Sequence, residues 1–185
     1  YAAYQSGDYA TALREWEPLA EQGDADAQNN LGVMYEKGQG VPQDHKTAIK
    51  WWKLAAEQGE GDAQSNLGFM YEKGNGVPQN YRTAVKWYKL GAKQGSALAQ
   101  SNLGVMYRKG LGVSQDYQIA IKWYELAAEQ SDVYAQNNLG FMYGTGRGVT
   151  QDFTRSHMWM NIAASLGHED AKKNKDIVGK DMTPA

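Results

Sequence analysis

The chain has 185 residues, and 19 Lys and Arg against 21 Asp and Glu leave a formal net charge of −2. This balance provides no global positive field that would attract a nucleic acid or an anionic membrane surface, so we expect neither as a partner. The chain contains no cysteine, which excludes disulfides, thiolate nucleophiles and cysteine-ligated zinc.

Residues 1–23 are expected to form an N-terminal helical hairpin with a truncated first helix. Asp8 follows Gly7 in a tight turn and is the expected N-cap of a second helix that Gly23 ends. Because only about one helical turn fits before Gly7, we expect the chain to begin inside an element. Further residues, and any targeting signal, would then lie upstream of Tyr1.

Four copies of a 36-residue unit follow this hairpin, at residues 24–59, 60–95, 96–131 and 132–167. A Leu-Gly pair recurs at this spacing without any insertion, as Leu31-Gly32, Leu67-Gly68, Leu103-Gly104 and Leu139-Gly140. A period of this size is typical of units that bury their apolar faces against copies of themselves. We therefore expect one continuous repeat domain over residues 1–185, built as an all-α solenoid.

Each copy has the pattern of two helices joined by a short turn. In the first copy, Gly38 is placed to end the first helix in the left-handed conformation, and Asp44 to cap the second. Gly32 removes bulk from the first helix, so that its partner can approach closely. In the second helix the aromatic positions recur as Trp51/Trp52, Trp87/Tyr88, Trp123/Tyr124 and Trp159/Met160. We expect them to pack between hairpins rather than to form a cofactor or sugar platform.

Residues 168–185 are expected to form a capping helix and a tail. Ala171 keeps the register of the first helices, but Lys175 and Asp176 replace the Leu-Gly pair. A terminal cap needs a polar outer face and an apolar inner one. Ile177 and Val178 would form the apolar inner face. Three lysines would form the polar outer face: Lys172, Lys173 and Lys175.

The repeated unit reads Ala-Gln-x-Asn-Leu-Gly-x-Met-Tyr-x-x-Gly-x-Gly-Val-x-x-Asp, followed by Ala-x-Lys-Trp and Ala-Ala-x-Gln-Gly. This pattern resembles the Sel-1-like repeat, a relative of the tetratricopeptide repeat. The resemblance implies a right-handed superhelix of antiparallel helix pairs, with first helices on the concave face and second helices outside. It also implies a non-enzymatic adaptor or scaffold for proteins or peptides, often periplasmic or secreted in bacteria.

Two departures from the pattern predict local irregularity. Ser131 replaces the glycine that closes the other second helices, so that turn should be strained or bent differently. Gly91 replaces an interior alanine and should loosen its helix.

The sequence offers no constellation for catalysis, a metal or a cofactor, so we expect none of the three. The histidines His45, His157 and His168 have no partner at helical spacing that would complete a zinc-like set. Some cysteine-rich members of the resembled family have been linked to β-lactam binding or hydrolysis. No serine here is followed three residues later by lysine, the arrangement such chemistry uses. β-Lactamase-like or penicillin-binding activity therefore ranks last. No run approaches the roughly 20 apolar residues that cross a bilayer, so we expect no membrane insertion.

A partner should bind where the copies differ or where a repeated residue has no packing role. The helical wheel places positions 26, 29, 33 and 36 of the first copy, and their equivalents, opposite the core. An apolar row edged by amides and hydroxyls suits an extended or helical peptide. The expected contact residues are Asn29, Val33, Ser65, Phe69, Leu98, Ser101, Val105, Arg108, Tyr134, Asn137 and Phe141.

Two alternatives remain open at this point. The row at position 33 could instead pack between neighbouring first helices. The whole chain could be a structural or self-assembling spacer that associates through its ends or its convex face, whereas the groove hypothesis favours a monomer. The repeated Asn30, Asn66, Asn102 and Asn138 are expected to link first helices through amide hydrogen bonds rather than to form a catalytic row.

Overall fold

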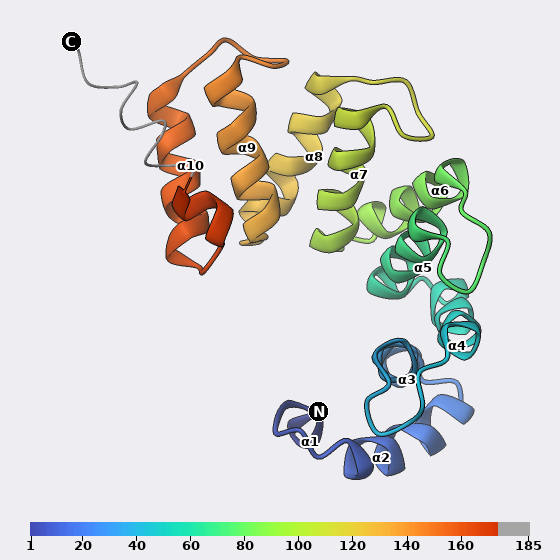
Figure 1. Ribbon diagram of the computed structural model, residues 1–185. Coiled ribbons are helices and arrows are strands. Elements are labelled where there is room, and N and C mark those ends of the chain that lie inside the picture. Colours follow the sequence, from blue (N-terminus) through green and yellow to red (C-terminus); the bar gives the residue numbers. More distant parts are fainter. Residues whose placement is uncertain (174–185) are drawn as a thin grey trace. The chain divides into compact units, whose positions relative to one another are not determined.

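The structure is a computed structural model, and it describes residues 1–173. Within this part of the chain every regular element is a helix, and no strand is present (Figure 1). Residues 169–173 are helical as well. The helices are α1 (Ala2–Gln5), α2 (Tyr9–Glu21), α3 (Ala25–Lys37), α4 (His45–Glu57), α5 (Gly61–Lys73), α6 (Tyr81–Lys93), α7 (Ala97–Lys109), α8 (Tyr117–Glu129), α9 (Val133–Thr145) and α10 (Phe153–Ser165).

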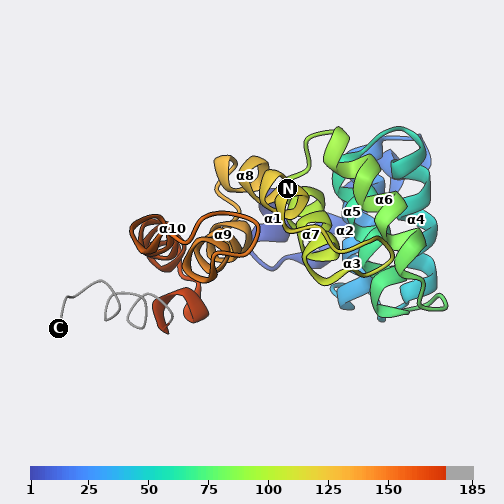
Figure 2. The same ribbon diagram turned by 90° about the horizontal axis from the view of Figure 1, so that it is seen from above.

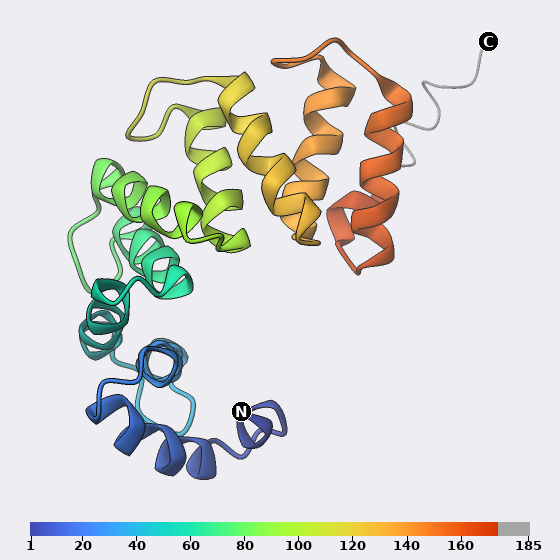
Figure 3. The same cartoon turned by 180° about the vertical axis from the view of Figure 1, so that it is seen from behind.

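The chain divides into two compact units, Tyr1–Ala99 and Gln100–Ala185. In the first unit α3 packs with α4 and α5 with α6, and in the second α9 packs with α10. Figures 1 and 3 show these pairs side by side. The prediction of an all-α solenoid of helix pairs is confirmed, and the expectation of one continuous domain stays a prediction.

The residues predicted to begin and end the helices do so. Asp8 Oδ1 accepts a hydrogen bond from the Thr11 backbone N–H at 3.1 Å. Asp44 Oδ1 accepts from the backbone N–H groups of Lys46 and Thr47. Gly38 ends α3 in the left-handed region with a φ of 68°, a conformation that costs glycine little. Local sequence therefore sets the bounds of these hairpins.

A glycine of the first helix and a large side chain of the second form the centre of each pair. A Cβ on Gly32 would lie 2.4 Å from Nε1 of the buried Trp52. The later copies repeat this contact with Gly68 and Tyr88, Gly104 and Tyr124, and Gly140 and Met160, at 2.6, 2.5 and 2.6 Å. The glycine thus provides the space that the large side chain needs within its own pair. Trp52 also lies in one core cluster with Leu67 and Met70 of the next copy, in agreement with the predicted packing between hairpins.

The two predicted irregularities have different outcomes. Ser131 has a φ of 66° and is the only residue other than glycine with a positive φ in residues 1–173, which confirms the strained turn. Helix α6 continues without a break past Gly91, from Tyr81 to Lys93, and the expected loosening stays a prediction. A Cβ at Gly91 would lie 2.7 Å from the Gly61 carbonyl oxygen. The missing side chain allows a close approach of backbones.

The predicted C-terminal cap is described only as far as residue 173. Ala171 is buried and packs with Ala163 and Ala164 of α10, while Lys172 and Lys173 are exposed. The remaining predicted cap residues lie outside the described residues: Lys175, Asp176, Ile177 and Val178.

Candidate functional site

The candidate site is the first-helix surface, by which we mean, for each unit by itself, position 26, 29, 33 or 36 of α3 and its equivalents in α5, α7 and α9. In the first unit, α3 and α5 lie on one side of the layer and α4 and α6 on the other (Figures 1 and 2). Helices α7 and α9 present the same positions, which continue the repeat register.

The side chains at position 29 are partly or fully buried, so they are less available to a partner than we expected. Ser65 and Ser101 are buried, so their hydroxyls are not available to a peptide backbone as we expected. Asn66 Nδ2 donates to Asn29 Oδ1 at 3.1 Å, which confirms an amide link between first helices for this pair. Asn137 Oδ1 is buried and has no hydrogen-bond partner among residues 1–173.

Position 33 divides into packed and exposed members. Val33 packs against the core of α4 and α5, and Val105 and Phe141 pack against the core of α8 and α9. Val33 and Val105 therefore pack against a core that includes the next first helix, as the alternative requires, whereas Phe141 packs against the core of its own helix and α8. Phe69 is 37 % exposed, and the Lys73 ammonium lies 5.4 Å from its ring centroid.

Position 36 contacts the buried tyrosines of the second helices. Glu72 Oε2 accepts a hydrogen bond from the Tyr88 hydroxyl at 2.8 Å. In the next copy Arg108 Nε donates to the Tyr124 hydroxyl at 3.3 Å. Burial raises the pKa of Tyr88, and the Glu72 carboxylate raises it further. Burial raises the pKa of Tyr124 to about 12, although the Arg108 cation acts in the opposite direction. Both phenols therefore stay protonated at neutral pH.

A group of three residues in the second unit combines two cations with one aromatic ring. The guanidinium carbons of Arg108 and Arg147 lie 5.9 and 5.2 Å from the ring centroid of Phe141. We call Arg108, Phe141 and Arg147 the arginine–phenylalanine cluster. Arg147, which lies in the turn after α9, was not predicted from the sequence. The residue at this repeat position differs in every copy, which could have marked Arg147 as a candidate contact residue. The four residues are Gln39, Asn75, Leu111 and Arg147.

Position 26 is acidic in the first two copies and carries leucine or tyrosine in the last two. Asp26 and Asp62 are exposed, and Asp62 Oδ1 accepts from the Ser96 hydroxyl at 2.6 Å. Leu98, at the start of α7, is exposed. Tyr134, at the start of α9, is 63 % exposed.

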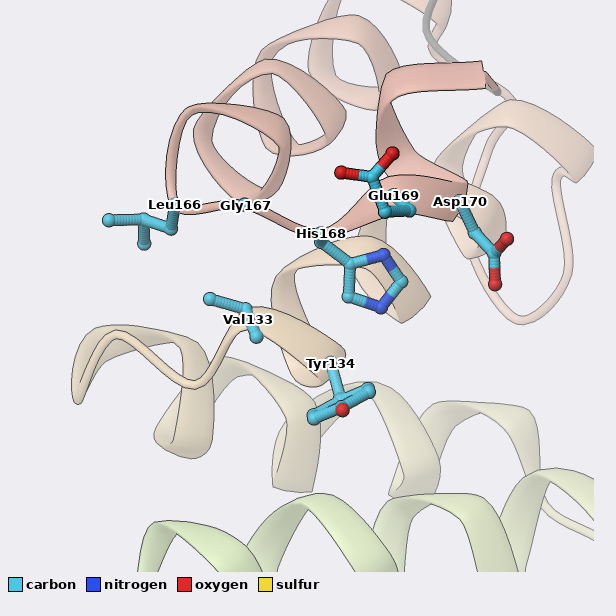
Figure 4. A pocket seen from close by; sticks show the side chains of 7 residues that line it. All are labelled: Val133, Tyr134, Leu166, Gly167, His168, Glu169 and Asp170. Atoms are coloured by element: carbon cyan, nitrogen blue, oxygen red, sulfur yellow. The ribbon is translucent and has the colours of Figure 1, made fainter. Parts of the chain in front are cut away.

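Tyr134 lies at the edge of an open hollow of about 340 Å³. The His168 ring stands nearly perpendicular to the Tyr134 ring, with 5.1 Å between their centroids. Figure 4 shows His168 beside Tyr134, while the carboxylates of Glu169 and Asp170 point away from that ring. The hollow is lined by Val133, Tyr134, Leu166, Gly167, His168, Glu169 and Asp170.

Two other kinds of site were sought in the described residues. Residues 1–173 contain no group of three or more His, Asp or Glu side chains placed to hold a metal ion. Over the same residues, none of the helices has both the length and the apolar character needed to cross a membrane.

Comparison with known proteins gives one family and several similar structures. The Sel1 repeat family model matches residues 25–60, 61–96, 97–132 and 133–168. The crystal structure of a Sel1 repeat protein from Oxalobacter formigenes is 34% identical over 94% of this chain and 73% of that chain, with a TM-score of 0.85. No curated protein sequence matches this chain.

Two further structures are similar over different lengths. The crystal structure of c5321, described as a protective antigen present in uropathogenic Escherichia coli strains and displaying an SLR fold, is 42% identical, with a TM-score of 0.78. The match covers 86% of this chain but 34% of that one, so this chain spans about a third of its length. Cysteine rich protein B of Helicobacter pylori is 23% identical, covers 71% of this chain and 94% of that one, and has a TM-score of 0.57. That likeness concerns the fold alone.

Proposed function

The chain belongs to the Sel1 repeat family, whose members are generally non-catalytic scaffolds for protein interactions, and from this premise we propose that it binds a peptide or protein partner on the first-helix surface. On this proposal the chain is an adaptor without catalytic activity of its own.

The observation that carries the proposal is an exposed aromatic side chain on this surface in each unit, Phe69 in the first and Tyr134 in the second. Both lie on first helices whose buried positions are nearly identical, so neither is needed to repeat the core. Aromatic side chains that are exposed on a rigid helix lose little conformational freedom on binding, and they often supply much of the energy of an interface.

The test is binding of wild type and variants to an array of short peptides of random sequence. We expect a subset of peptides to bind the wild type and to be lost with Phe69→Ala and Tyr134→Ala. The matched controls are Leu54→Ala and Leu126→Ala, because these leucines are 46% and 44% exposed on the second helices. The controls should retain binding, and thermal unfolding should show that all four variants stay folded. Binding that survives both aromatic changes would contradict the proposal.

A second candidate function, self-association, is favoured by a separation of charge within the first unit. The exposed residues of α4 and α6 include one acidic side chain, Glu57, and seven basic ones, whereas α3 and α5 carry four acidic residues against two lysines. The residues of α3 and α5 are Asp26, Glu36, Asp62 and Glu72, with Lys37 and Lys73. Two unlike faces that attract each other between copies would extend into an open assembly. Concentration-dependent light scattering that salt suppresses, with no peptide bound on the array, would favour this candidate. The basic residues are Lys46, Lys50, Lys53, Arg82, Lys86, Lys89 and Lys93.

A further inference from the structure

We infer that the arginine–phenylalanine cluster binds a carboxylate of the peptide partner, and that this carboxylate lies about three residues from a bulky apolar side chain. The inference rests on the proposed function, because it specifies the peptide that the first-helix surface of the second unit would accept.

The charges of the second unit are the first argument. Neither α7 nor α9 contains an Asp or Glu, although the residues at position 36 of the first unit are Glu36 and Glu72. None of the ion pairs described in residues 1–173 involves Arg108 or Arg147. Two guanidiniums beside one ring repel each other, and an anion bound between them offsets that repulsion. The missing counter-charge is thus a negative one.

The geometry of Arg108 is the second argument. Its Nε donates to the Tyr124 hydroxyl, while its guanidinium lies over the Phe141 ring. These two contacts orient the side chain and leave its terminal nitrogens for another acceptor. A guanidinium held in this way can donate two parallel hydrogen bonds to one carboxylate. Because the orientation exists before binding, the loss of side-chain freedom on binding is small.

The spacing along α9 is the third argument. Tyr134 precedes Phe141 by two helical turns, so both lie on the same side of the helix. At a rise of about 1.5 Å per residue they are separated by ~10 Å along the axis. A peptide in the polyproline II conformation rises about 3.1 Å per residue and returns to the same face every three residues, so it covers that length in about three residues with both side chains on this surface. A peptide that places an apolar side chain on Tyr134 therefore brings a carboxylate three residues away to the cluster.

The experiment compares two peptide series with the whole chain. In the first, amidated peptides contain Phe-x-x-Glu or Phe-x-x-Gln, with random residues elsewhere; in the second, a free C-terminal carboxylate takes the place of the Glu side chain. We expect the wild type to bind carboxylate peptides at least about tenfold more tightly than their amide counterparts. A preference in the first series identifies a side-chain carboxylate, and one in the second series a chain terminus. Either supports the site.

Three variants connect the preference to the cluster. Arg147→Gln and Arg108→Gln should each abolish it, and Arg147 is exposed, so its change tests the site even if Arg108→Gln disturbs folding. Arg155→Gln is the matched control, because Arg155 also lies over a ring, that of Tyr143, but pairs with Asp152. It should keep the preference. Equal binding of acid and amide peptides by the wild type would overturn the carboxylate inference alone, whereas failure of every peptide to bind would overturn the proposed function with it.

Discussion

The two units of the chain share one pattern of packing but differ in the charge of their first-helix surfaces. Helices α3 and α5 of the first unit carry four acidic residues and two lysines, whereas α9 of the second unit has no charged residue, and the part of α7 in that unit has Arg108 and Lys109. The acidic residues are Asp26, Glu36, Asp62 and Glu72, and the lysines are Lys37 and Lys73. The glycine and the large side chain that it accommodates recur in both units. Repetition is therefore strict where residues pack, and it relaxes where a partner could bind.

One pair of positions shows how this difference arises without change to the core. Tyr88 donates its hydrogen bond to Glu72 in the first unit, and Tyr124 accepts one from Arg108 in the second. A phenol can act in either role. The same buried tyrosine is thus compatible with an anion or a cation at position 36, and the surface charge can reverse while the packing stays constant.

The largest expected effect is the loss of stability when a buried tyrosine is removed, and it tests whether the cores of the two units are equivalent. Tyr88→Ala and Tyr124→Ala each remove a fully buried aromatic ring, so each should lower the free energy of unfolding by about 3–5 kcal/mol. Urea titration of both variants measures the loss. Lys86→Ala, an exposed change on α6, is the control and should cost less than about 0.5 kcal/mol. A large loss from only one of the two tyrosines would show that the cores are not equivalent.

The sequence was sufficient to predict this shared core but not the surface that differs. The positions of Gly38 and Asp44 follow from local backbone requirements, and that of Gly32 from the close approach of the two helices, which any copy must repeat; all three were predicted correctly. The burial of Ser65 and Ser101 was not predicted, because a helical wheel shows where a side chain points and not how closely the next helix approaches. Arg147 was missed because it lies in a turn and reaches Phe141 only through the fold.

A second effect concerns alkaline pH. The ordinary pKa of tyrosine is about 10, and burial raises that of Tyr124 to about 12 in the folded chain. Below about pH 10 the phenol is protonated in both states, so it does not alter stability with pH. Between about pH 10 and 12 the unfolded chain loses this proton first, and the free energy of unfolding falls by about 2–3 kcal/mol. Tyr124→Phe should remove this part of the fall, measured by urea unfolding at about pH 9 and about pH 11.

The neighbours of the two phenols sharpen the same comparison. Glu72→Gln removes a charge that raises the pKa of Tyr88, so the Tyr88 phenolate should form at a lower pH. Arg108→Gln removes a charge that lowers the pKa of Tyr124, so its phenolate should form at a higher pH. Because the chain has 12 tyrosines, each phenol is followed as the difference in phenolate absorbance between a variant and the same variant that also carries Tyr88→Phe or Tyr124→Phe. Shifts of the same sign would contradict the opposite roles of the two neighbours.

The smallest expected effect is a change in the free energy of unfolding at the turns that follow the second helices. Gly23 and Ser131 occupy equivalent positions with φ values of 98° and 66°, and a side chain in the left-handed region costs about 1–2 kcal/mol. Ser131→Gly should therefore raise the free energy of unfolding by about 1 kcal/mol, less the freedom that glycine adds to the unfolded chain. Gly23→Ser is the reciprocal control: a Cβ there would meet no atom within 4 Å, so any loss comes from the backbone and not from a clash. Calorimetry of both variants should give opposite shifts in the melting temperature. If Ser131→Gly leaves the melting temperature unchanged while Gly23→Ser lowers it, the turn after α8 tolerates serine without strain. The second unit would then differ from the first in its backbone as well as in its surface charge.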